Sequence, residues 1–171
     1  TNTLTQNTSE NNASQGFSVG SNGNTLVNNN SDSNQLAGFR ILGEKNVLKD
    51  NISSNNSWYG INLNSANNNQ IVNNLSTNNS FHGFLLSSSS NVYLAQNEAD
   101  SNAGYGFSLS GTSLSDTLVK NNFIGGVANP DSGLKNSSGN SHTISHNWWG
   151  TTDETVLNNR ISDTVNSFSP Y

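Results

Sequence analysis

Aromatic side chains recur at one spacing in the middle of the chain. The step from Trp58 to Phe81 equals the step from Tyr59 to His82, and Tyr105 follows His82 after the same step again. Rings held in a row offer flat faces to sugar rings, and the surrounding Asn and Ser side chains can donate and accept hydrogen bonds. These five residues are therefore the predicted ligand-binding residues, for a carbohydrate. The alternative is that one residue of each pair folds inward and the other shields a turn.

Ionisable side chains form only small groups at comparable spacings. Glu10 and Asp32 are separated by a similar step, and two carboxylates brought together in this way could share a calcium ion, although a solvated turn is the alternative. Asp116 and His142 are separated by a slightly longer step and are expected to be neighbours as well. No spacing typical of a zinc site is present. We predict no cofactor, with Glu10 and Asp32 as the weak metal candidate.

All of these spacings belong to one repeat. Counted from Leu48, an Asn follows at the third and eighth positions, a Ser at the fifth, a Gly at the twelfth, and apolar residues at the thirteenth and fifteenth. The same pattern begins at Leu4, Leu26, Ile71 and Leu94 (with Ala99 in place of the Ser) and, in reduced form, at Leu118 and Ile144. The step between these starting residues is nearly constant and lengthens only slightly toward Ile144. A period of roughly 22 residues is typical of a solenoid, in which each unit covers the apolar face of the next.

The unit of this solenoid is made of strands. Apolar residues alternate with polar ones, as in Phe39-x-Ile41 and Ile61-x-Leu63, and no unit carries a helical stretch. Three short strands per unit predict one coil of a right-handed parallel β-helix, about seven coils in all, spaced by about 4.8 Å. We expect the Asn columns to form hydrogen-bonded stacks and to take left-handed turns, and the Gly column to need positive φ or close backbone approach.

The pattern predicts one domain with two parts. Residues 1–146 carry the repeats, and residues 147–171 form a capping segment in which Thr152 or Asp153 begins a short helix and Trp148 and Trp149 plug the core. Residues 125–140 are expected to form a loop outside the barrel. Because the pattern is already in register at Leu4, the chain is either part of a longer protein or pairs through its first coil with a partner or another copy.

Composition narrows the class of protein. The chain has 35 Asn and 29 Ser among 171 residues, only 10% charged residues, a net charge of −5 and no cysteine. Six basic residues do not make the basic surface that nucleic acids require, and no apolar run approaches the ~20 residues of a membrane span. Disulfides are excluded. This polar composition, low in charge, favours a secreted or cell-surface protein.

The columns resemble the right-handed parallel β-helix repeats of the pectate-lyase-like superfamily. Among these, the Asn-rich repeats of carbohydrate-associated surface proteins and of the periplasmic copper-maturation type (nitrous oxide reductase maturation) are the most similar. The resemblance extends over residues 2–150 and implies the fold. It leaves the function open, because the superfamily includes lyases, hydrolases, epimerases, adhesins and structural proteins.

One segment is similar to mannuronan C5-epimerases. Phe81-His82-Gly83-Phe84, with Tyr59-Gly60 one unit earlier, resembles stretches in these enzymes. The enzymes also need an aspartate and a second histidine in a Y-G-F-D-P-H type motif, where this chain has Tyr59-Gly60-Ile61-Asn62-Leu63. Without an acid/base pair, proton abstraction is not supported, so His82 is only a weak catalytic candidate.

Two functional hypotheses follow. The first is a non-catalytic β-helix module of a secreted or surface protein, serving as a structural, adhesive or assembly unit that contacts polysaccharide. The second is a fragment of a lyase, epimerase or hydrolase that acts on acidic polysaccharide. Neither hypothesis involves nucleic acid or membrane insertion.

Overall fold

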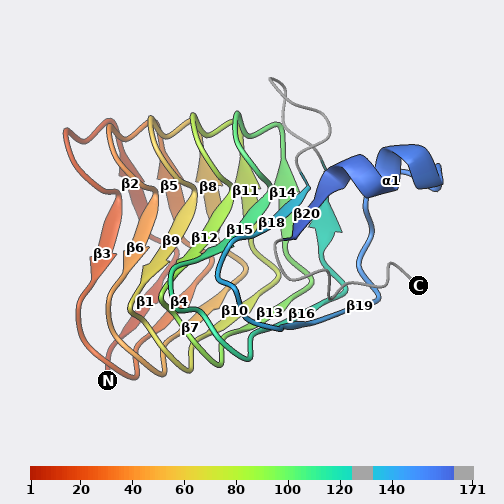
Figure 1. Cartoon of the computed structure of the whole chain (residues 1–171). Coiled ribbons are helices and arrows are strands. Elements are labelled where there is room, and N and C mark those ends of the chain that lie inside the picture. The colour runs from red at the N-terminus through yellow and green to blue at the C-terminus, as the bar shows by residue number, and fades with distance from the viewer. Residues whose placement is uncertain (125–132, 164–171) are drawn as a thin grey trace.

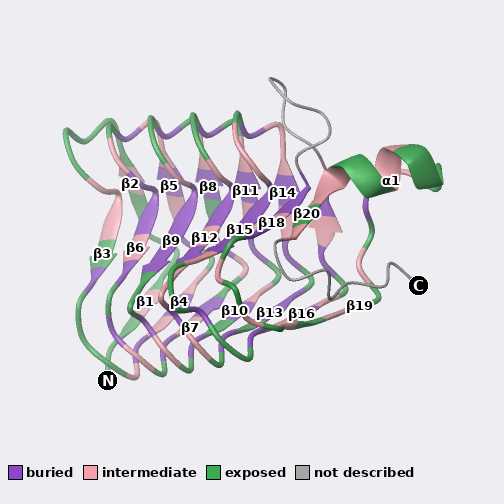
Figure 2. Cartoon of the chain, in the orientation of Figure 1, coloured by how far each residue is buried: buried purple, intermediate pink, exposed green. Residues whose placement is uncertain are grey.

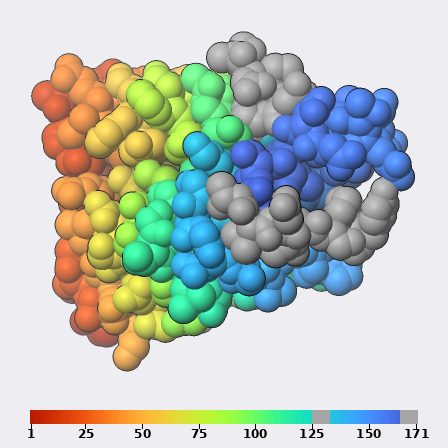
Figure 3. Space-filling model, viewed as in Figure 1, coloured from red at the N-terminus to blue at the C-terminus, as the bar shows by residue number. Residues whose placement is uncertain are grey.

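The computed structural model describes residues 1–124 and 133–163. In this range the chain winds into a parallel β-helix of about seven coils, each built from up to three short strands, and one helix stands at the end opposite the N-terminal coil (Figure 1). The strands of successive coils stack into three parallel sheets, called A, B and C here. In the space-filling view the sequence runs in successive bands from one end of the molecule to the other (Figure 3). The predicted fold class is confirmed.

The strands of each sheet follow the chain coil by coil. Sheet A contains β1 Thr3–Thr5, β4 Thr25–Val27, β7 Val47–Lys49, β10 Gln70–Val72, β13 Tyr93–Ala95, β16 Thr117–Val119 and β19 Thr143–Ser145. Sheet B contains β2 Thr8–Glu10, β5 Asn30–Asp32, β8 Ile52–Ser54, β11 Leu75–Thr77, β14 Glu98–Asp100 and β17 Asn122–Phe123. Sheet C contains β3 Phe17–Val19, β6 Phe39–Ile41, β9 Ile61–Asn64, β12 Phe84–Ser87, β15 Phe107–Ser110, β18 Leu134–Asn136 and β20 Ile161–Asp163.

The apolar core is the interior of this prism, where equal repeat positions lie above one another. Leu26 pairs with Leu48 and Leu48 with Ile71, and the first apolar position forms one column that is buried from Leu26 to Leu118 and half-buried at its ends, Leu4 and Ile144. Figure 2 shows how burial is distributed over the strands of these coils. A second column holds stacked rings, with the centroids of Phe84 and Phe107 4.5 Å apart and nearly parallel. The third inward position forms a further column of Val, Ile and Leu side chains in the first five coils. Alternation along each strand therefore sends every second residue into the core, as predicted.

Asparagine ladders hold the corners of the coils together. The backbone N–H of Asn29 and its Nδ2 both donate to the Oδ1 of Asn51 one coil later, at 2.9 and 3.0 Å. Asn34 makes the same two bonds to the Oδ1 of Asn56. Each buried carboxamide thereby satisfies backbone groups that no strand pairing reaches.

The prediction that these ladder residues take left-handed conformations is wrong. Positive φ occurs one residue earlier, for example at Asn28 (55°) and Asp50 (57°), just before Asn29 and Asn51. The ladder side chain has to point into the coil to reach the next carboxamide, so its neighbour makes the bend instead. Of the two alternatives for the Gly column, close approach is the right one: a Cβ on Gly60 would overlap the Ser76 side chain, and Gly60 is not among the residues with positive φ.

The predicted loop at residues 125–140 is partly wrong. Residues 125–132 lie outside the described part, but Leu134–Asn136 return to the helix as strand β18, in register with Phe107–Leu109. Gly133, Leu134 and Asn136 take the places of the repeat's Gly and its two inward residues. The spacing of the repeat is lost in the sequence after Ile124, but the chain resumes the repeat at β18. This strand pairs with β15 and so continues sheet C.

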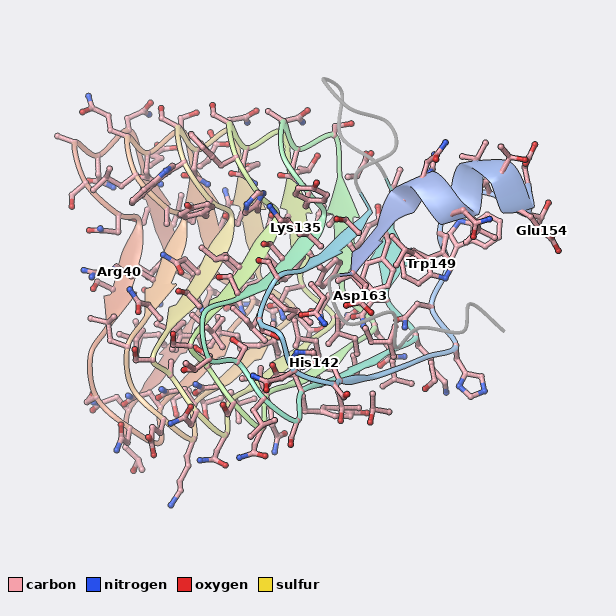
Figure 4. The ribbon with its side chains drawn as sticks, in the orientation of Figure 1. Arg40, Lys135, His142, Trp149, Glu154 and Asp163 are labelled. Atoms are coloured by element: carbon pink, nitrogen blue, oxygen red, sulfur yellow. The ribbon has the colours of Figure 1, made fainter. Side chains whose placement is uncertain are left out.

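The C-terminal segment closes the core at one end. Asp153 begins helix α1 (Glu154–Arg160), since its carboxylate accepts from the N–H groups of Thr155 and Val156. Trp149 plugs the end of the apolar core as predicted, with its ring 4.4 Å from that of Phe123 and only 8% exposed (Figure 4). Trp148 does not plug it, because its side chain points outward and is 48% exposed. Strand β20 of this segment extends sheet C beyond β18. Residues 164–171, the end of the predicted capping segment, lie outside the described part.

Candidate functional site

The five predicted ligand-binding residues come together along the corner between sheets B and C. They occupy the turns that connect β8 to β9, β11 to β12 and β14 to β15. The turns are tied to one another by backbone bonds, such as those from the N–H of Phe81 to the carbonyl of Trp58 and from the N–H of Gly83 to the carbonyl of Tyr105, both 3.0 Å. Equal repeat positions thus become adjacent in space.

The five rings form one continuous row, which we call the aromatic ridge (Trp58, Tyr59, Phe81, His82 and Tyr105). Trp58 stacks on Tyr59 with centroids 4.7 Å apart, and both meet Phe81 edge-on at 6.5 and 5.7 Å. His82 lies between Tyr59 and Tyr105, 5.6 Å from each ring. These spacings are typical of favourable aromatic pairs, so the rings hold one another in place.

The ridge lies on the surface and not in the core. Trp58 is 37% exposed and Phe81 47% exposed, while Tyr59, His82 and Tyr105 are half-buried. Exposed large apolar side chains in one place are a mark of a binding surface. The glycine that follows each of the first two aromatic pairs lies against the next coil, where a Cβ on Gly60 or Gly83 would overlap neighbouring atoms.

His82 has its tautomer set by the backbone of the next coil. Its Nδ1 accepts a hydrogen bond from the N–H of Tyr105 at 3.0 Å. Burial of the ring and, to a smaller extent, the positive charge of Lys135 lower the pKa of His82 to about 4. The neutral imidazole therefore carries its proton on Nε2 and can donate there. A general base would need a free lone pair, so this geometry does not favour His82 as the catalytic base.

Lys135 is a residue of this site that the sequence analysis missed. Its Nζ lies 5.4 Å from the centroid of the Tyr105 ring, at the end of the ridge. It was missed because it falls in the segment interpreted as a loop. The signal was present in the sequence Gly133-Leu134-Lys135-Asn136, which matches Gly106-Phe107-Ser108-Leu109 in its spacing of a glycine, an inward, an outward and another inward position.

The segment similar to the epimerase motif lies on strand β9. Ile61 and Leu63 point into the core, and Asn62 takes the outward position that the motif gives to its aspartate. The Asn62 side chain is 7% exposed, and its Oδ1 accepts no hydrogen bond from the described residues. The outward column through Asn62 consists of Ser18, Arg40, Asn62, Leu85, Ser108, Lys135 and Ser162. These seven described positions contain two cations but neither a carboxylate nor a histidine.

Glu10 and Asp32 are partners in the register of sheet B, as their spacing predicted. Asp32 accepts hydrogen bonds from the Oγ of Ser54 (2.6 Å), the Nδ2 of Asn55 (2.7 Å) and the Oγ of Ser33 (2.8 Å). These bonds, led by that from Ser54, lower the pKa of Asp32. Across residues 1–124 and 133–163 no three ionisable side chains gather in a metal-binding arrangement. Calcium binding by Glu10 and Asp32 stays a prediction.

Asp116 and His142 lie on neighbouring coils, as expected, with both side chains buried. The Nδ1 of His142 is 3.2 Å from the Oδ2 of Asp116, and its Nε2 is 2.9 Å from the Oγ of Ser138. The residue types are those of a nucleophilic triad. However, Nδ1 accepts the backbone N–H of Asp116 (3.3 Å), and Oδ2 has no hydrogen-bond partner in the described part of the chain. A triad histidine donates from Nδ1 to its carboxylate, so this group continues the Asn ladder and is not arranged for catalysis.

Comparison with known proteins places the fold in a family. Residues 1–149 match the family model described as a right-handed β-helix region. The chain belongs to the right-handed β-helix family. A search of curated protein sequences found no match. In the described residues, no helix has the length and apolar character needed to span a membrane.

Two solved structures illustrate the similarity in this β-helix family. The periplasmic alginate epimerase AlgG superimposes with a TM-score of 0.78 at 19% identity, covering 85% of this chain and 39% of that one. The A-module of the Azotobacter vinelandii mannuronan C-5 epimerase AlgE6 gives a TM-score of 0.62 at 17% identity, covering 86% of this chain and 58% of that one. The chain therefore spans about two fifths of the first structure and less than two thirds of the second. At these identities the likeness shows the fold.

Proposed function

We propose that this β-helix is a non-catalytic polysaccharide-binding module and that the aromatic ridge is its binding surface. The observation that carries the proposal is the unbroken row of five rings over three successive coils, with Trp58 and Phe81 exposed. A polysaccharide is itself a linear repeat of flat, amphipathic units. A rigid row of rings matches such a ligand without losing conformational entropy on binding.

The residues beside the ridge support binding more than chemistry. The outward position that carries the acid in the epimerase motif is Asn62, and Asn64 holds the next outward position on β9. The neutral His82 uses one nitrogen for the backbone of Tyr105 and so offers a donor in place of a base. The structural neighbours are named alginate and mannuronan epimerases, which agrees with a polysaccharide as the ligand class.

Affinity electrophoresis through gels that contain polysaccharides tests the proposal. We expect retardation by at least one polysaccharide, reduced about tenfold in affinity by Trp58→Ala and by Phe81→Ala, since a sugar that covers one exposed ring removes apolar surface from water at about 25 cal/mol per Å². Tyr93→Ala is the matched control, because Tyr93 is 43% exposed but lies on sheet A, away from the ridge. Retardation that is equal in all three variants would refute the ridge as the binding surface.

The second candidate function is an enzyme acting on acidic polysaccharide, with part of its catalytic groups supplied from outside this segment. The similarity of fold to two epimerases favours it. Incubation with mannuronan, followed by measurement of epimer composition, unsaturated ends and reducing ends, separates the two functions. The binding module leaves all three unchanged. A product that disappears in His82→Ala would establish the enzyme instead.

Location and assembly are parts of the same proposal. A secreted or cell-surface site agrees with a polysaccharide ligand and with the word periplasmic in the name of one neighbour. The first coil has only half-buried Leu4 and Phe17 over its core, so pairing with a further strand edge would cover them. Light scattering over a range of protein concentrations measures this association, and Leu4→Lys should abolish it. A mass that stays that of the monomer at every concentration would contradict it.

A further inference from the structure

The aromatic ridge ends at a cation. Lys135 lies on strand β18 at an outward position, in register with Ser108 and Ser162, and its Nζ approaches the face of Tyr105 (Figure 4). Its ammonium makes no ion pair within residues 1–124 and 133–163. A Lys held by an aromatic face and left without a counter-ion keeps its charge available to a ligand.

A fixed hydrogen-bond donor lies beside this cation. The backbone N–H of Tyr105 donates a hydrogen bond to the Nδ1 of His82, so the proton of the neutral imidazole is on Nε2. The ring cannot turn freely, because Tyr59 and Tyr105 lie on its two sides. Both His82 and Lys135 contact Tyr105, so the donor and the cation are two points of one small surface.

The outward positions of the two sheets that meet at the ridge differ in the sign of their charges. The outward positions of the described sheet B strands hold four acids and no base, and the acids are Glu10, Asp32, Glu98 and Asp100. Sheet C carries Arg40 and Lys135 in one outward column, toward opposite ends of the sheet (Figure 4). The potential along the ridge therefore draws an anionic group toward sheet C and repels it from sheet B.

We propose that Lys135 and His82 form an anion-recognition point at the end of the aromatic ridge, so that the module selects glycans carrying carboxylate or sulfate groups over neutral ones. This inference rests on the proposed function and adds the charge class of its ligand. The rings supply contact area to any sugar, whereas the Nζ of Lys135 and the Nε2–H of His82 bind an anionic oxygen. Lys135 and His82 are then the specificity-determining residues of the ridge.

Matched ligands test the selection. Dextran and dextran sulfate share one backbone and differ in the anionic sulfate esters, and polymannuronate presents carboxylates on a different backbone. We expect the wild-type protein to bind one or both of the charged polymers more tightly than dextran, and added salt to reduce this difference. Lys135→Gln should lower affinity for the charged polymer about fivefold more than affinity for dextran, as expected for one partly exposed charge pair. Lys135→Arg should retain the preference.

A control variant distinguishes a local effect from a change in net charge. Lys45→Gln removes the same charge from an exposed residue between sheets C and A, far from the ridge, and should leave binding unchanged. If Lys135→Gln and Lys45→Gln behave alike, or if dextran binds as well as the charged polymers, the inference is overturned while the ridge as a binding surface stands. If no polymer binds the wild-type protein, the proposed function fails as well. Tighter binding of polymannuronate or of dextran sulfate identifies the preferred anion.

Discussion

At the scale of single residues, His82 shows how one backbone contact decides the chemistry of a side chain. The segment Phe81-His82-Gly83-Phe84, in which it lies, resembles stretches in mannuronan C5-epimerases. Burial of the ring and, to a smaller extent, the charge of Lys135 lower its pKa to about 4, and the hydrogen bond from the N–H of Tyr105 to Nδ1 leaves a donor at Nε2. The lowered pKa of His82 predicts how the stability of the protein depends on pH.

Stability should fall as the pH drops from about 6.5 toward 4. In this window the unfolded His82 takes up a proton that the folded one does not, so protons favour the unfolded state. Above about 6.5 the contribution of His82 is fully present. Urea unfolding at about pH 7 and about pH 5 measures the effect. His82→Gln, whose amide oxygen can still accept the N–H of Tyr105, should lose most of the difference between the two pH values.

The exposed His146 provides the control for this measurement. His146→Gln should keep the pH dependence of the wild-type protein. Carboxylates with a lowered pKa, such as Asp32, act at lower pH, below the window chosen here. An unchanged slope in His82→Gln would show that His82 is not the group responsible.

At the scale of elements, strands of two to four residues are too short to be stable alone, and the Asn ladders join them into coils. Asn56 accepts from the N–H and the Nδ2 of Asn34 and donates to Asn79 and Ser53. One side chain thus connects three successive coils. This explains why a chain so rich in Asn folds, since these amides are buried in hydrogen-bonded rows.

Asn56→Ala should therefore destabilise the protein by about 3 kcal/mol, because the buried N–H and Nδ2 of Asn34 both lose the Oδ1 that accepts from them. The exposed Asn64 is the matched control, and Asn64→Ala should change the free energy of unfolding by less than about 0.5 kcal/mol. Urea unfolding of both variants makes the comparison. Equal losses would mean that the ladders contribute no more than surface amides do.

At the scale of the whole molecule, the β-helix is a row of coils that contact only their neighbours, so its ends are weaker than its middle. The C-terminal end is closed by Trp149, whose ring continues the buried row of Phe107 and Phe123. Its neighbour Trp148 points outward. Two adjacent tryptophans therefore have different structural roles.

Trp149→Ala should cost about 3–5 kcal/mol, because it removes a buried indole and opens the core. Trp148→Ala should cost less than about 1 kcal/mol. Hydrogen exchange resolves where the loss falls: amide protection should drop in β16 and β19 and persist in β7 and β10, since coils unfold from the weakened end. Uniform loss of protection along the chain would show that the β-helix unfolds as one cooperative unit.

Much of this architecture could be predicted because a repeat converts spacing in sequence into contact in space. The columns through Leu48 and Phe84, the register of Glu10 with Asp32 and the grouping of the aromatic ridge all follow from equal repeat positions. The return of the chain at Leu134 was missed because the irregular sequence that follows Ile124 interrupts the constant step, although the order of glycine, inward, outward and inward positions is present at residues 133–136.

The amino-acid sequence alone determined the period, the inward columns and which aromatic residues are neighbours, because these depend only on strands pairing in register. Only the tertiary structure decided the direction of the Asn ladders, the outward side chain of Trp148, the tautomer of His82 and the contact of Lys135 with Tyr105. Each of these depends on atoms from two or more coils at hydrogen-bonding or van der Waals distance. A residue's repeat position does not contain that information.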